Sequence, residues 1–527
     1  MKIWVKMNKS LGELKNRNQM AKARTRNNGY ALCFEISMEK TTHIAVVPSP
    51  GFSHLIPVLE FSKRLVHLHP DFHVTFIIPS LESPPPSSVA YLQNLPSNIQ
   101  SIFLPPISKQ DVPKDANIAV QIQLTVAKSL PSLQQELKSL NSKSHLAAIV
   151  ADPFAAEVLS FAKELNTSSF IYFPSAASTL SFCFYLPTLH EEISGEFRDV
   201  PEPIQIPGCV PLYGRDLPEP FQNRSSESYT SFLQRTKRLF SVDGLLVNTF
   251  TEMEEGAVRA LTQKESGYPP VYPIGPNTQT RSNGEENGSE CLKWLENQPP
   301  SSVLYVSFGS GGTLSQEQIN ELAFGLESSG QKFLWVLRAP SNSVNAAYLG
   351  STNENPLDFL PEGFLERTRE QGFVIPSWAP QVSILSHRSI GGLLSHCGWN
   401  STLESVQKGV PIIAWPLFAE QRMNAVLLTD GLKVALRPKV NENGIVEREE
   451  IAKLVKLLME GEEGKEIRKR MKNLRDASAN ALKEDGSSTK ALSEVALKWK
   501  SNLNAIGIPN CIYVHTQVVE NEAKNVK

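Results

Sequence analysis

The sequence predicts an α/β protein in which two doubly wound domains lie in tandem and face a central cleft. Short, nearly continuous apolar runs bounded by turn residues alternate with amphipathic helical patterns along most of the chain. Such runs are typical of parallel strands that are buried on both faces of a sheet. The alternation occurs twice, on either side of the polar, Gly- and Asn-rich segment 278–290, which we interpret as a linker. Because doubly wound sheets bind ligands at the carboxyl ends of their strands, we expect the functional site in the cleft.

Each half of the chain contributes its own series of strands. An amphipathic helix over 55–68 follows the first strand, and its apolar residues recur at helical spacing. In the second half we expect helices over 316–328, from about 401, and over 420–430, with helical, charged sequence over 447–500. The expected strands are 43–50, 73–80, 146–153, 170–174, 243–250 and 271–276 in the first half, and 303–308, 333–338, 372–376, 389–395, 411–416 and 433–437 in the second.

These patterns divide the chain into domains. The segment 340–357 is polar and is expected to form a surface loop. Residues 1–37 are basic and lack the apolar core of a secretory signal, so either an organellar presequence or an upstream extension before Met38 remains open. The expected division is a disordered N-terminal extension 1–37, a first domain 38–277, the linker 278–290, a second domain 291–480, a C-terminal helix 481–503 that packs back on the first domain, and a tail 504–527.

Composition excludes several classes of protein. Apolar residues make up 41% and charged residues 20% of the 527 residues, as in ordinary globular proteins. A formal net charge of −2 provides no electrostatic footprint for nucleic acid. The uncharged stretch 170–189 contains Pro174 and Pro187, which favours a buried strand and helix over a membrane span. The cysteines are scattered without paired spacing, which indicates reduced thiols of a cytoplasmic protein: 33, 183, 209, 291, 397 and 511.

The segment Trp378–Gln421 contains two strand-to-helix turns whose residues suit a nucleotide sugar. Trp378 follows a strand, where an indole can stack on a planar base or pack half-buried. Ala379 and Gln381 follow it, with backbone groups near a base edge. At the second turn, Glu420 and Gln421 open a helix, where an acid and an amide suit sugar hydroxyls or merely favour the first helical turn.

The motif 395–404 lies between those turns and suits an anion. Gly398 permits close backbone approach, and Asn400 or Ser401 is a candidate helix cap, so the free N–H groups beyond form an anion site. His396 is either a hydrogen-bond donor to a diphosphate or a satisfied core histidine. Glu404 either binds a ribose diol or closes a capping box with Ser401.

Two further groups complete the candidate site. In the glycine-rich turn 307–313, Ser310 and Thr313 are candidates for phosphate or sugar contacts, and the turn lacks the third glycine of GxGxxG. His54 and Asp152 each follow a strand of the first half, and a histidine oriented by a buried carboxylate is a general-base arrangement. Phe154, Phe418 and the segment 174–178 are candidate acceptor-pocket walls, with core packing as the alternative.

The residues 378–421 resemble the signature box of plant family-1 UDP-glycosyltransferases. The segments HIAVVPSPGFSHLIPVLEF, SFGSGGTLSQEQINELAFGLE, MNAVLLTDGLKVALRP and EDGSSTKALSEVALKWK are similar to the branch that contains hydroquinone (arbutin-forming) and monolignol glucosyltransferases. The similarity covers about residues 40–500. It implies a GT-B fold, with two Rossmann-like domains, and inverting transfer of glucose from UDP-glucose to a hydroxyl of a small phenolic or phenylpropanoid acceptor.

The resemblance also implies roles for residues at matching positions. His54 would be the general base and Asp152 its partner. Ser53 replaces the glycine usual before that histidine, and Pro153 stands where many relatives have a bulkier or β-branched residue. Both would border the acceptor pocket, with Ser53 and His54 among the residues that bind the acceptor. No DxD sequence occurs in the chain, which favours a site without metal or other cofactor, and we expect a monomer. The donor residues would be Trp378 on uracil beside Ala379 and Gln381, then His396, Trp399, Asn400 and Ser401 on the diphosphate, Glu404 on the ribose, and Glu420 and Gln421 on the sugar.

Three alternatives follow from the sequence. An NAD(P)-dependent oxidoreductase shares the tandem α/β pattern but needs the GxGxxG fingerprint that the chain lacks. A non-catalytic nucleotide-sugar binder would require the loss of His54 or Asp152, and both are present. A UDP-glycosyltransferase with another donor sugar or a non-phenolic acceptor remains open.

Overall fold

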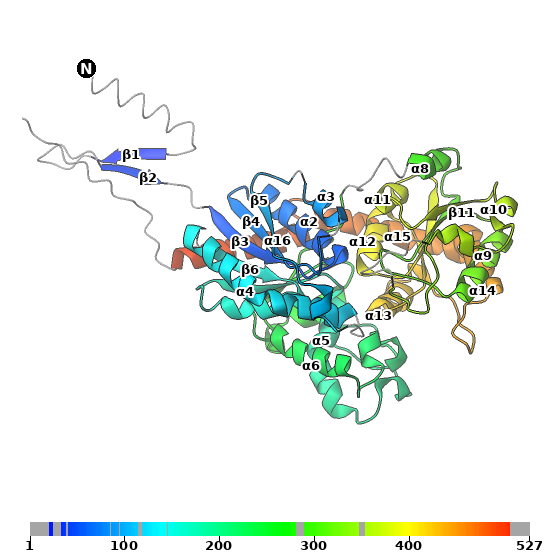
Figure 1. The fold of residues 1–527 in the computed structure, drawn as a ribbon, viewed down its shortest axis with the longest axis horizontal. Coiled ribbons are helices and arrows are strands. Elements are labelled where there is room, and N and C mark those ends of the chain that lie inside the picture. The colour runs from blue at the N-terminus through cyan, green and yellow to red at the C-terminus, as the bar shows by residue number, and fades with distance from the viewer. Residues whose placement is uncertain are drawn as a thin grey trace, which may run out of the picture.

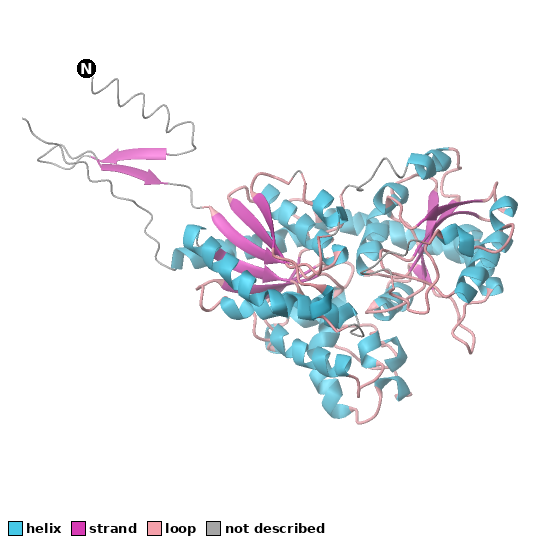
Figure 2. Ribbon diagram, viewed as in Figure 1, coloured by secondary structure: helices cyan, strands magenta, loops and turns pink. Residues whose placement is uncertain are grey.

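Two parallel sheets, each with helices on both faces, form the two domains of the protein (Figures 1 and 2). The computed structural model describes residues 20–24, 33–37 and 41–505, except 85, 94, 114–117, 145, 281–288 and 347–353. Both sheets have the doubly wound strand order, in which the chain turns back beside its first strand. The predicted fold class is therefore confirmed.

The N-terminal sheet has seven strands in the order β5-β4-β3-β6-β7-β8-β9, and all neighbours are parallel. Every residue of β6 and β7 is buried, as their continuous apolar sequences predict. Only β5 was missed, because it is an edge strand with polar residues at its centre and one buried residue. The strands are β3 (Thr42–Val47), β4 (Phe72–Ile78), β5 (Ile99–Phe103), β6 (Leu146–Ala151), β7 (Ser168–Phe173), β8 (Gly244–Val247) and β9 (Val271–Pro273).

The helices of this domain connect the strands. The uncharged stretch 170–189 divides into β7 and α5, as predicted. None of the helices within the described residues combines the length and the apolar character that a membrane crossing requires. The helices are α2 (Phe52–Leu68), α3 (Pro86–Tyr91), α4 (Ile118–Ser144), α5 (Ala177–Glu192), α6 (Glu227–Leu239) and α7 (Glu255–Thr262), with short 3₁₀ helices η1 (Lys109–Asp111), η2 (Pro153–Phe161), η3 (Phe197–Asp199), η4 (Gly214–Asp216), η5 (Glu219–Phe221) and η6 (Lys264–Ser266).

The C-terminal sheet has six parallel strands in the order β12-β11-β10-β13-β14-β15. All of them match predicted strands. The central strands β10 and β13 are fully buried, and the chain order reverses between them. The strands are β10 (Val303–Ser307), β11 (Lys332–Leu337), β12 (Gly372–Pro376), β13 (Ile390–Ser395), β14 (Ile412–Ala414) and β15 (Ala435–Leu436).

Most helices of the C-terminal half cover this sheet, and the last one packs against the N-terminal domain. The segment 420–430, predicted as one helix, is a short α-helix continued by a π-helical turn. The elements are α8 (Ser289–Glu296), α9 (Gln316–Ser329), η7 (Pro356–Phe359), α10 (Phe364–Arg367), α11 (Gln381–Leu385), α12 (Trp399–Lys408), α13 (Gln421–Val426), η8 (Leu427–Gly431), α14 (Arg448–Glu460), α15 (Glu462–Ala481) and α16 (Ser487–Ala505).

Helix α16 lies against the N-terminal domain (Figure 1). Its residues Leu492, Val495 and Trp499 belong to the hydrophobic core beneath β3 and β4. The Trp499 ring centroid lies 5.2 Å from that of Phe170 and 6.1 Å from that of Phe72. The end of the chain therefore contributes to the core of its beginning.

The ends and loops of the chain are described only in part. Within 1–37, β1 (Met20–Arg24) pairs antiparallel with β2 (Cys33–Ser37). The rest of 1–37, most of the linker 278–290, part of the loop 340–357 and the tail beyond 505 lie outside the described residues.

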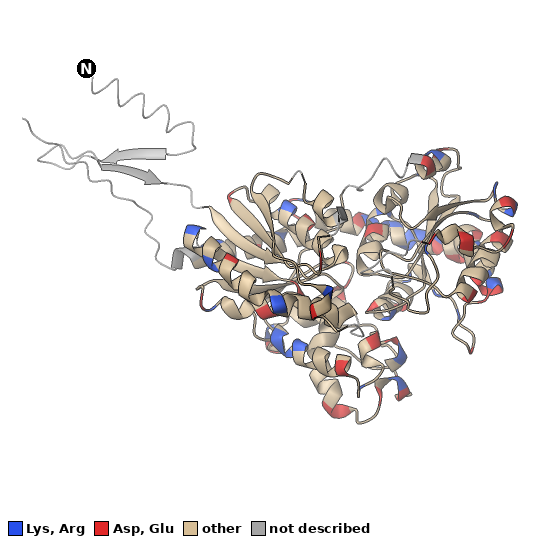
Figure 3. Ribbon diagram, in the orientation of Figure 1, with Lys and Arg blue, Asp and Glu red and all other residues tan. Residues whose placement is uncertain are grey.

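The distribution of charged side chains agrees with the small net charge of the sequence. Figure 3 shows Lys and Arg interspersed with Asp and Glu over the helices of both domains, while the strands are mostly uncharged. The cysteines whose side chains the structure describes form no disulfide, namely Cys183, Cys209, Cys291 and Cys397.

Truncation of Trp499 tests the contribution of α16. Trp499→Ala should lower the free energy of unfolding by about 3–5 kcal/mol, because it empties a fully buried aromatic site. The matched control is Leu497→Ala on the same helix, where the side chain is 64% exposed and the change should stay within about 0.5 kcal/mol. Thermal and denaturant unfolding measure both values, and equal effects would contradict the docking of α16.

Candidate active site

A cavity of about 490 Å³ lies between the two domains, at the carboxyl ends of both sheets. Residues from both domains line it, including His54 and Phe154 from the first and Trp378 and His396 from the second. Its size is typical of pockets for small organic ligands. The cavity also lies where the chain order reverses in each sheet, which is the expected position for a ligand.

The first turn of α12 joins the two domains beside this cavity. The Asn400 Nδ2 donates to the Ser53 carbonyl oxygen at 2.8 Å, and the Trp399 indole Nε1 donates to the Asn248 carbonyl oxygen at 2.7 Å. These bonds place the N-terminus of α12 opposite the first turn of α2.

His54 lies in that first turn of α2 and is hydrogen-bonded to Asp152 at the end of β6. The two atoms, Nδ1 of His54 and Oδ2 of Asp152, are 2.6 Å apart. The other carboxylate oxygen accepts from the Phe154 N–H at 2.9 Å, so Asp152 also caps η2. This geometry brings the predicted general base and its orienting carboxylate together.

The surroundings of His54 determine its pKa. Burial acts to lower the pKa of His54, but the charge and hydrogen bond of Asp152, assisted by the charge of Glu420, outweigh it, and the net result is a pKa above the ordinary 6.5. A raised pKa makes the imidazole a stronger base than free histidine.

The turn before His54 is not distorted by Ser53. The left-handed backbone falls on Gly51, with φ 128°, whereas Ser53 lies inside α2. Its carbonyl accepts the inter-domain hydrogen bond from Asn400. Pro153 occupies the first position of η2, where its fixed φ suits a helix start.

His396 and the N-terminus of α12, the candidate anion site, line the cavity from the C-terminal domain. Burial and, secondarily, the charge of Arg338 lower the pKa of His396 to about 4, so the ring is neutral near pH 7. Its Nδ1 is buried without a hydrogen-bond partner, as is Oδ1 of Asn400. Orphaned buried polar atoms beside a cavity are the atoms that a bound ligand can satisfy. The free N–H groups of the first helical turn point toward the same region.

Glu404 is part of a hydrogen-bond network rather than a capping box. Gln381 donates from Nε2 to Ser401 Oγ at 3.0 Å and to Glu404 Oε2 at 2.8 Å. Because α12 begins at Trp399 with Gly398 as its cap, Ser401 lies inside the helix and the capping-box alternative is wrong. The expectation that Asn400 or Ser401 caps the helix is wrong for the same reason. Burial raises the pKa of Glu404 to about 7.

The loop after β12 presents the aromatic candidate. The Trp378 side chain is 43% exposed and lines the cavity beside Ala379 and Gln381. A large indole left exposed at a cavity is more consistent with stacking on a ligand than with core packing.

Glu420 and Gln421 lie at the start of α13 and line the cavity. The Gln421 Oε1 accepts from the N–H groups of Leu417 and Phe418, at 2.8 and 2.9 Å. The amide oxygen is therefore occupied in holding its own loop, and the amide NH₂ is the group left for a ligand oxygen.

Two donor candidates occupy other roles in the structure. Thr313 was a candidate for phosphate or sugar contact, but its hydroxyl donates to the Ser343 carbonyl oxygen at 2.6 Å and does not line the cavity. Trp399 was expected on the diphosphate, and because its indole N–H donates to the Asn248 carbonyl oxygen, its backbone is the part left for a ligand. Ser310 lines the cavity as expected.

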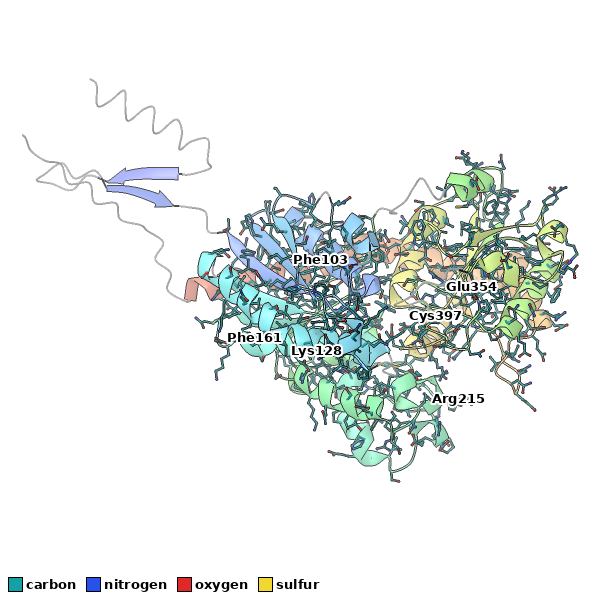
Figure 4. All side chains as sticks on the ribbon, in the orientation of Figure 1. Phe103, Lys128, Phe161, Arg215, Glu354 and Cys397 are labelled. Atoms are coloured by element: carbon teal, nitrogen blue, oxygen red, sulfur yellow. The ribbon has the colours of Figure 1, made fainter. Side chains whose placement is uncertain are left out.

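The acceptor candidates line the cavity from both domains. Ser53, Phe154 and, in the segment 174–178, Pro174 and Ser175 do so from the N-terminal domain, and Phe418 does so from the C-terminal domain. Cys397, labelled in Figure 4, is buried in the C-terminal domain beside the cleft. Among the described residues, no group of His, Cys, Asp and Glu is arranged to hold a metal ion.

Sequence reasoning missed Arg338 and the strained backbone of the site. Arg338 directly follows β11 and lines the cavity, and a basic residue at a strand's carboxyl end was the available signal. Three non-glycine residues with positive φ, Ser377, Cys397 and Ala419, each directly precede a candidate donor residue. Such conformations cluster at functional sites.

Replacement of Gly309 tests the position of His396. Gly309 has φ 73°, and an added Cβ would lie 2.4 Å from Cε1 of His396. Gly309→Ala should therefore displace the imidazole and weaken UDP binding by about 10- to 100-fold, as expected for a lost hydrogen bond to a charged group. Isothermal titration calorimetry with UDP measures the change.

The matched control is Gly330→Ala. Gly330 has φ 67° at the end of α9, with nothing within 4 Å of an added Cβ. It has the same backbone strain without the clash, so UDP affinity should not change. Equal losses in both variants would contradict a role for His396 in diphosphate binding.

Comparison with known proteins agrees with this geometry. Residues 239–475 match the family model "UDP-glucoronosyl and UDP-glucosyl transferase". The chain is 52% identical to the hydroquinone glucosyltransferase of Rauvolfia serpentina over 89% of its own length and 100% of the relative's. It is 51% identical to UDP-glycosyltransferase 72B1 of Arabidopsis thaliana over 88% and 97% of the two lengths.

A solved structure shows the same fold. Phytolacca americana UGT2 complexed with UDP-2fluoro-glucose and pterostilbene superposes with a TM-score of 0.80, at 47% identity, and covers 87% of this chain and 100% of its own. The fold, the cleft and the sequence similarity all lead to one assignment: the chain belongs to the UDP-glucoronosyl and UDP-glucosyl transferase family and is a UDP-glycosyltransferase.

Proposed function

We propose that the protein is an inverting, UDP-glucose-dependent glucosyltransferase that acts on a hydroxyl group of small phenols, with His54 as general base. The observation that carries this proposal is the His54–Asp152 pair, which lies across the cavity from the N-terminus of α12. A base on one wall and an anion site on the other are the two requirements of a direct displacement at a sugar carbon.

The proposed reaction proceeds in one displacement. With Nδ1 of His54 bonded to Asp152, Nε2 takes the proton from the acceptor hydroxyl. The acceptor oxygen forms a bond to the anomeric carbon while the bond from that carbon to the diphosphate oxygen breaks, and its electron pair leaves with UDP. Attack from the face opposite the leaving group inverts the configuration. Since a phenol has a pKa of about 10, a positioned base contributes about 10²–10⁴-fold to the rate.

The leaving diphosphate is stabilised by neutral donors and one guanidinium in this proposal. The first-turn N–H groups of α12, the neutral His396 and the nearby Arg338 face the same part of the cavity. Preorganised donors of this kind stabilise developing negative charge without a metal ion. We therefore propose that the reaction needs no divalent metal, in line with the absence of a DxD sequence.

Glucose is the donor sugar that the cavity supports best. Glu420 offers a carboxylate for sugar hydroxyl hydrogens, and the free NH₂ of Gln421 offers a donor for a sugar oxygen. Relatives named as glucosyltransferases and a neighbour bound to UDP-2fluoro-glucose support the same choice.

The acceptor wall favours an aromatic molecule. Phe154 packs edge-on against the His54 ring, with centroids 5.7 Å apart, and Phe418 lines the cavity from the other domain. An aromatic acceptor between them would place a ring hydroxyl beside His54.

The described cysteines form no disulfide, which supports action in the cytoplasm. Both walls of the cleft come from one chain, which supports a monomer.

A panel of UDP-sugars tests the donor. UDP-glucose should support transfer to hydroquinone and other simple phenols with a higher kcat/KM than UDP-galactose, UDP-xylose or UDP-glucuronate, measured as UDP release. Rates should be unchanged by EDTA. The glucose assignment fails if another UDP-sugar is used and UDP-glucose is not, and the metal assignment fails if EDTA abolishes turnover.

Removal of the His54 imidazole tests the base. His54→Ala should lower kcat by about 10²–10⁴-fold, because the acceptor proton then has no positioned base. UDP affinity should stay at the wild-type value, since His54 lies on the acceptor wall. Near-normal turnover would show that another group takes the proton.

The pH profile tests the partnership with Asp152. A base must be unprotonated, so kcat/KM should rise with pH through the pKa of His54, which lies above 6.5, and then level off. Asp152→Asn removes the charge that raises this pKa and leaves burial, which lowers it. In this variant the rise of kcat/KM should occur at lower pH, and its plateau value should fall. If the rise occurs at the same pH as in the wild type, Asp152 does not set the pKa of the titrating group.

A further inference from the structure

Arg235 lies on the acceptor wall and has no role in the reaction proposed above. It occupies the second half of α6, and its side chain lines the cavity. The guanidinium carbon lies 4.2 Å from the ring centroid of Phe232 and 4.7 Å from that of Phe154. Phe154 in turn contacts His54, so Arg235 lies one aromatic ring away from the general base.

The charge of Arg235 has no ion-pair partner among the described residues. Glu157, the acidic residue nearest along η2, is paired with Arg238 at 2.8 Å. Asp152 is bonded to His54 and to the Phe154 N–H. The amide of Gln123, turned with its oxygen toward Arg235, accepts from Nε and Nη1 at 3.1 Å. A neutral amide thus holds one edge of the guanidinium, and the carboxylates whose charges act on it, Glu157 and Asp152, are bonded to other partners.

A guanidinium that forms no ion pair with the described residues and lines an aromatic cavity favours an anionic ligand. Burial lowers the pKa of Arg235 to about 10, so the group remains charged near neutrality. Its planar fork matches a carboxylate, and the interaction strengthens where water is excluded. Arg338 is the other arginine that lines the cavity, and it lies beside His396 on the donor wall. The two cations therefore serve different ends of the cleft.

We propose that Arg235 binds the carboxylate of the acceptor, so that hydroxylated aromatic acids are preferred over neutral phenols of the same size. This inference rests on the proposed glucosyltransferase function and specifies its acceptor class. The aromatic ring of the acceptor lies against Phe154, with the carboxylate at Arg235 and the ring hydroxyl at His54.

The same geometry determines which oxygen is glucosylated. A carboxylate held by Arg235 is kept away from His54, whereas the phenolic hydroxyl reaches it. The new bond joins the phenolic oxygen to the anomeric carbon, the bond to UDP breaks, and the phenolic proton passes to His54. The product is a phenolic glucoside with a free carboxylate and not a glucose ester.

A matched pair of acceptors tests this assignment. We would compare 4-hydroxycinnamic acid with its methyl ester in the wild type, Arg235→Gln and Arg235→Lys. Arg235→Gln should lower kcat/KM for the acid by about 10- to 100-fold, as for loss of a charge-assisted hydrogen bond, and leave the ester within about threefold. Arg235→Lys should fall between, because it keeps the charge without the fork. Product stability in dilute alkali distinguishes the glucoside from the ester.

The matched control is Lys237→Gln, two residues further along α6. It removes an exposed cation that does not line the cavity, so the acid-to-ester ratio should not change. Equal losses for acid and ester in Arg235→Gln would reduce Arg235 to a packing partner of Phe154 and Phe232. A wild-type preference for the ester, or an alkali-labile product, would also overturn the proposal.

Failure of this inference can be told apart from failure of the proposed function. If hydroquinone is glucosylated but the acid is not, only the role of Arg235 is wrong. If UDP-glucose supports no turnover at all, calorimetric binding of the acid to the wild type and to Arg235→Gln still decides whether Arg235 holds a carboxylate. Equal affinity in the two proteins would reject it.

Discussion

The first turn of α12 is the constraint on which the active site depends. Asn400 binds the backbone of Ser53, and Trp399 binds the backbone of Asn248, so this turn bridges the domains. We propose that the N–H groups of the same turn form the anion site. Because this segment bridges the domains, direct hydrogen bonds set the distance between the proposed diphosphate site and His54. His54, the proposed base, lies one residue from the bonded carbonyl of Ser53.

Burial shifts the pKa values of two titratable groups in the cleft toward the neutral form. It lowers the pKa of His396 to about 4, which keeps the ring neutral, and it raises the pKa of Glu404 to about 7. His54 is the exception, since Asp152 reverses the effect of burial and keeps the imidazole basic. The proposed donor wall therefore combines neutral donors with Arg338 and Glu420, while the proposed acceptor wall carries His54 and Arg235. This division fits a reaction in which negative charge develops on one side and a proton is removed on the other.

Much of the fold followed from local pattern. Apolar strands of both sheets were predicted because each is buried on two faces, which leaves a continuous hydrophobic run. Strand β5 was missed because an edge strand has no such run. Backbone strain was also invisible, since Ser377, Cys397 and Ala419 adopt positive φ without being glycine. Only the surrounding packing can hold the backbone of a non-glycine residue in that conformation.

By itself, the sequence determined the fold class, the order of the strands along the chain and most of the candidate site, because these depend on the alternation of apolar runs and on motifs at strand ends. The three-dimensional packing was needed to show which polar atoms remain available to a ligand. It assigned Glu404 to a network with Gln381 instead of a helix cap, and it occupied the Trp399 indole and the Thr313 hydroxyl elsewhere. It also showed the hydrogen bond between His54, which follows β3, and Asp152, which follows β6. A hydrogen bond between residues distant in sequence depends on the positions of both partners in space, and no local pattern specifies that.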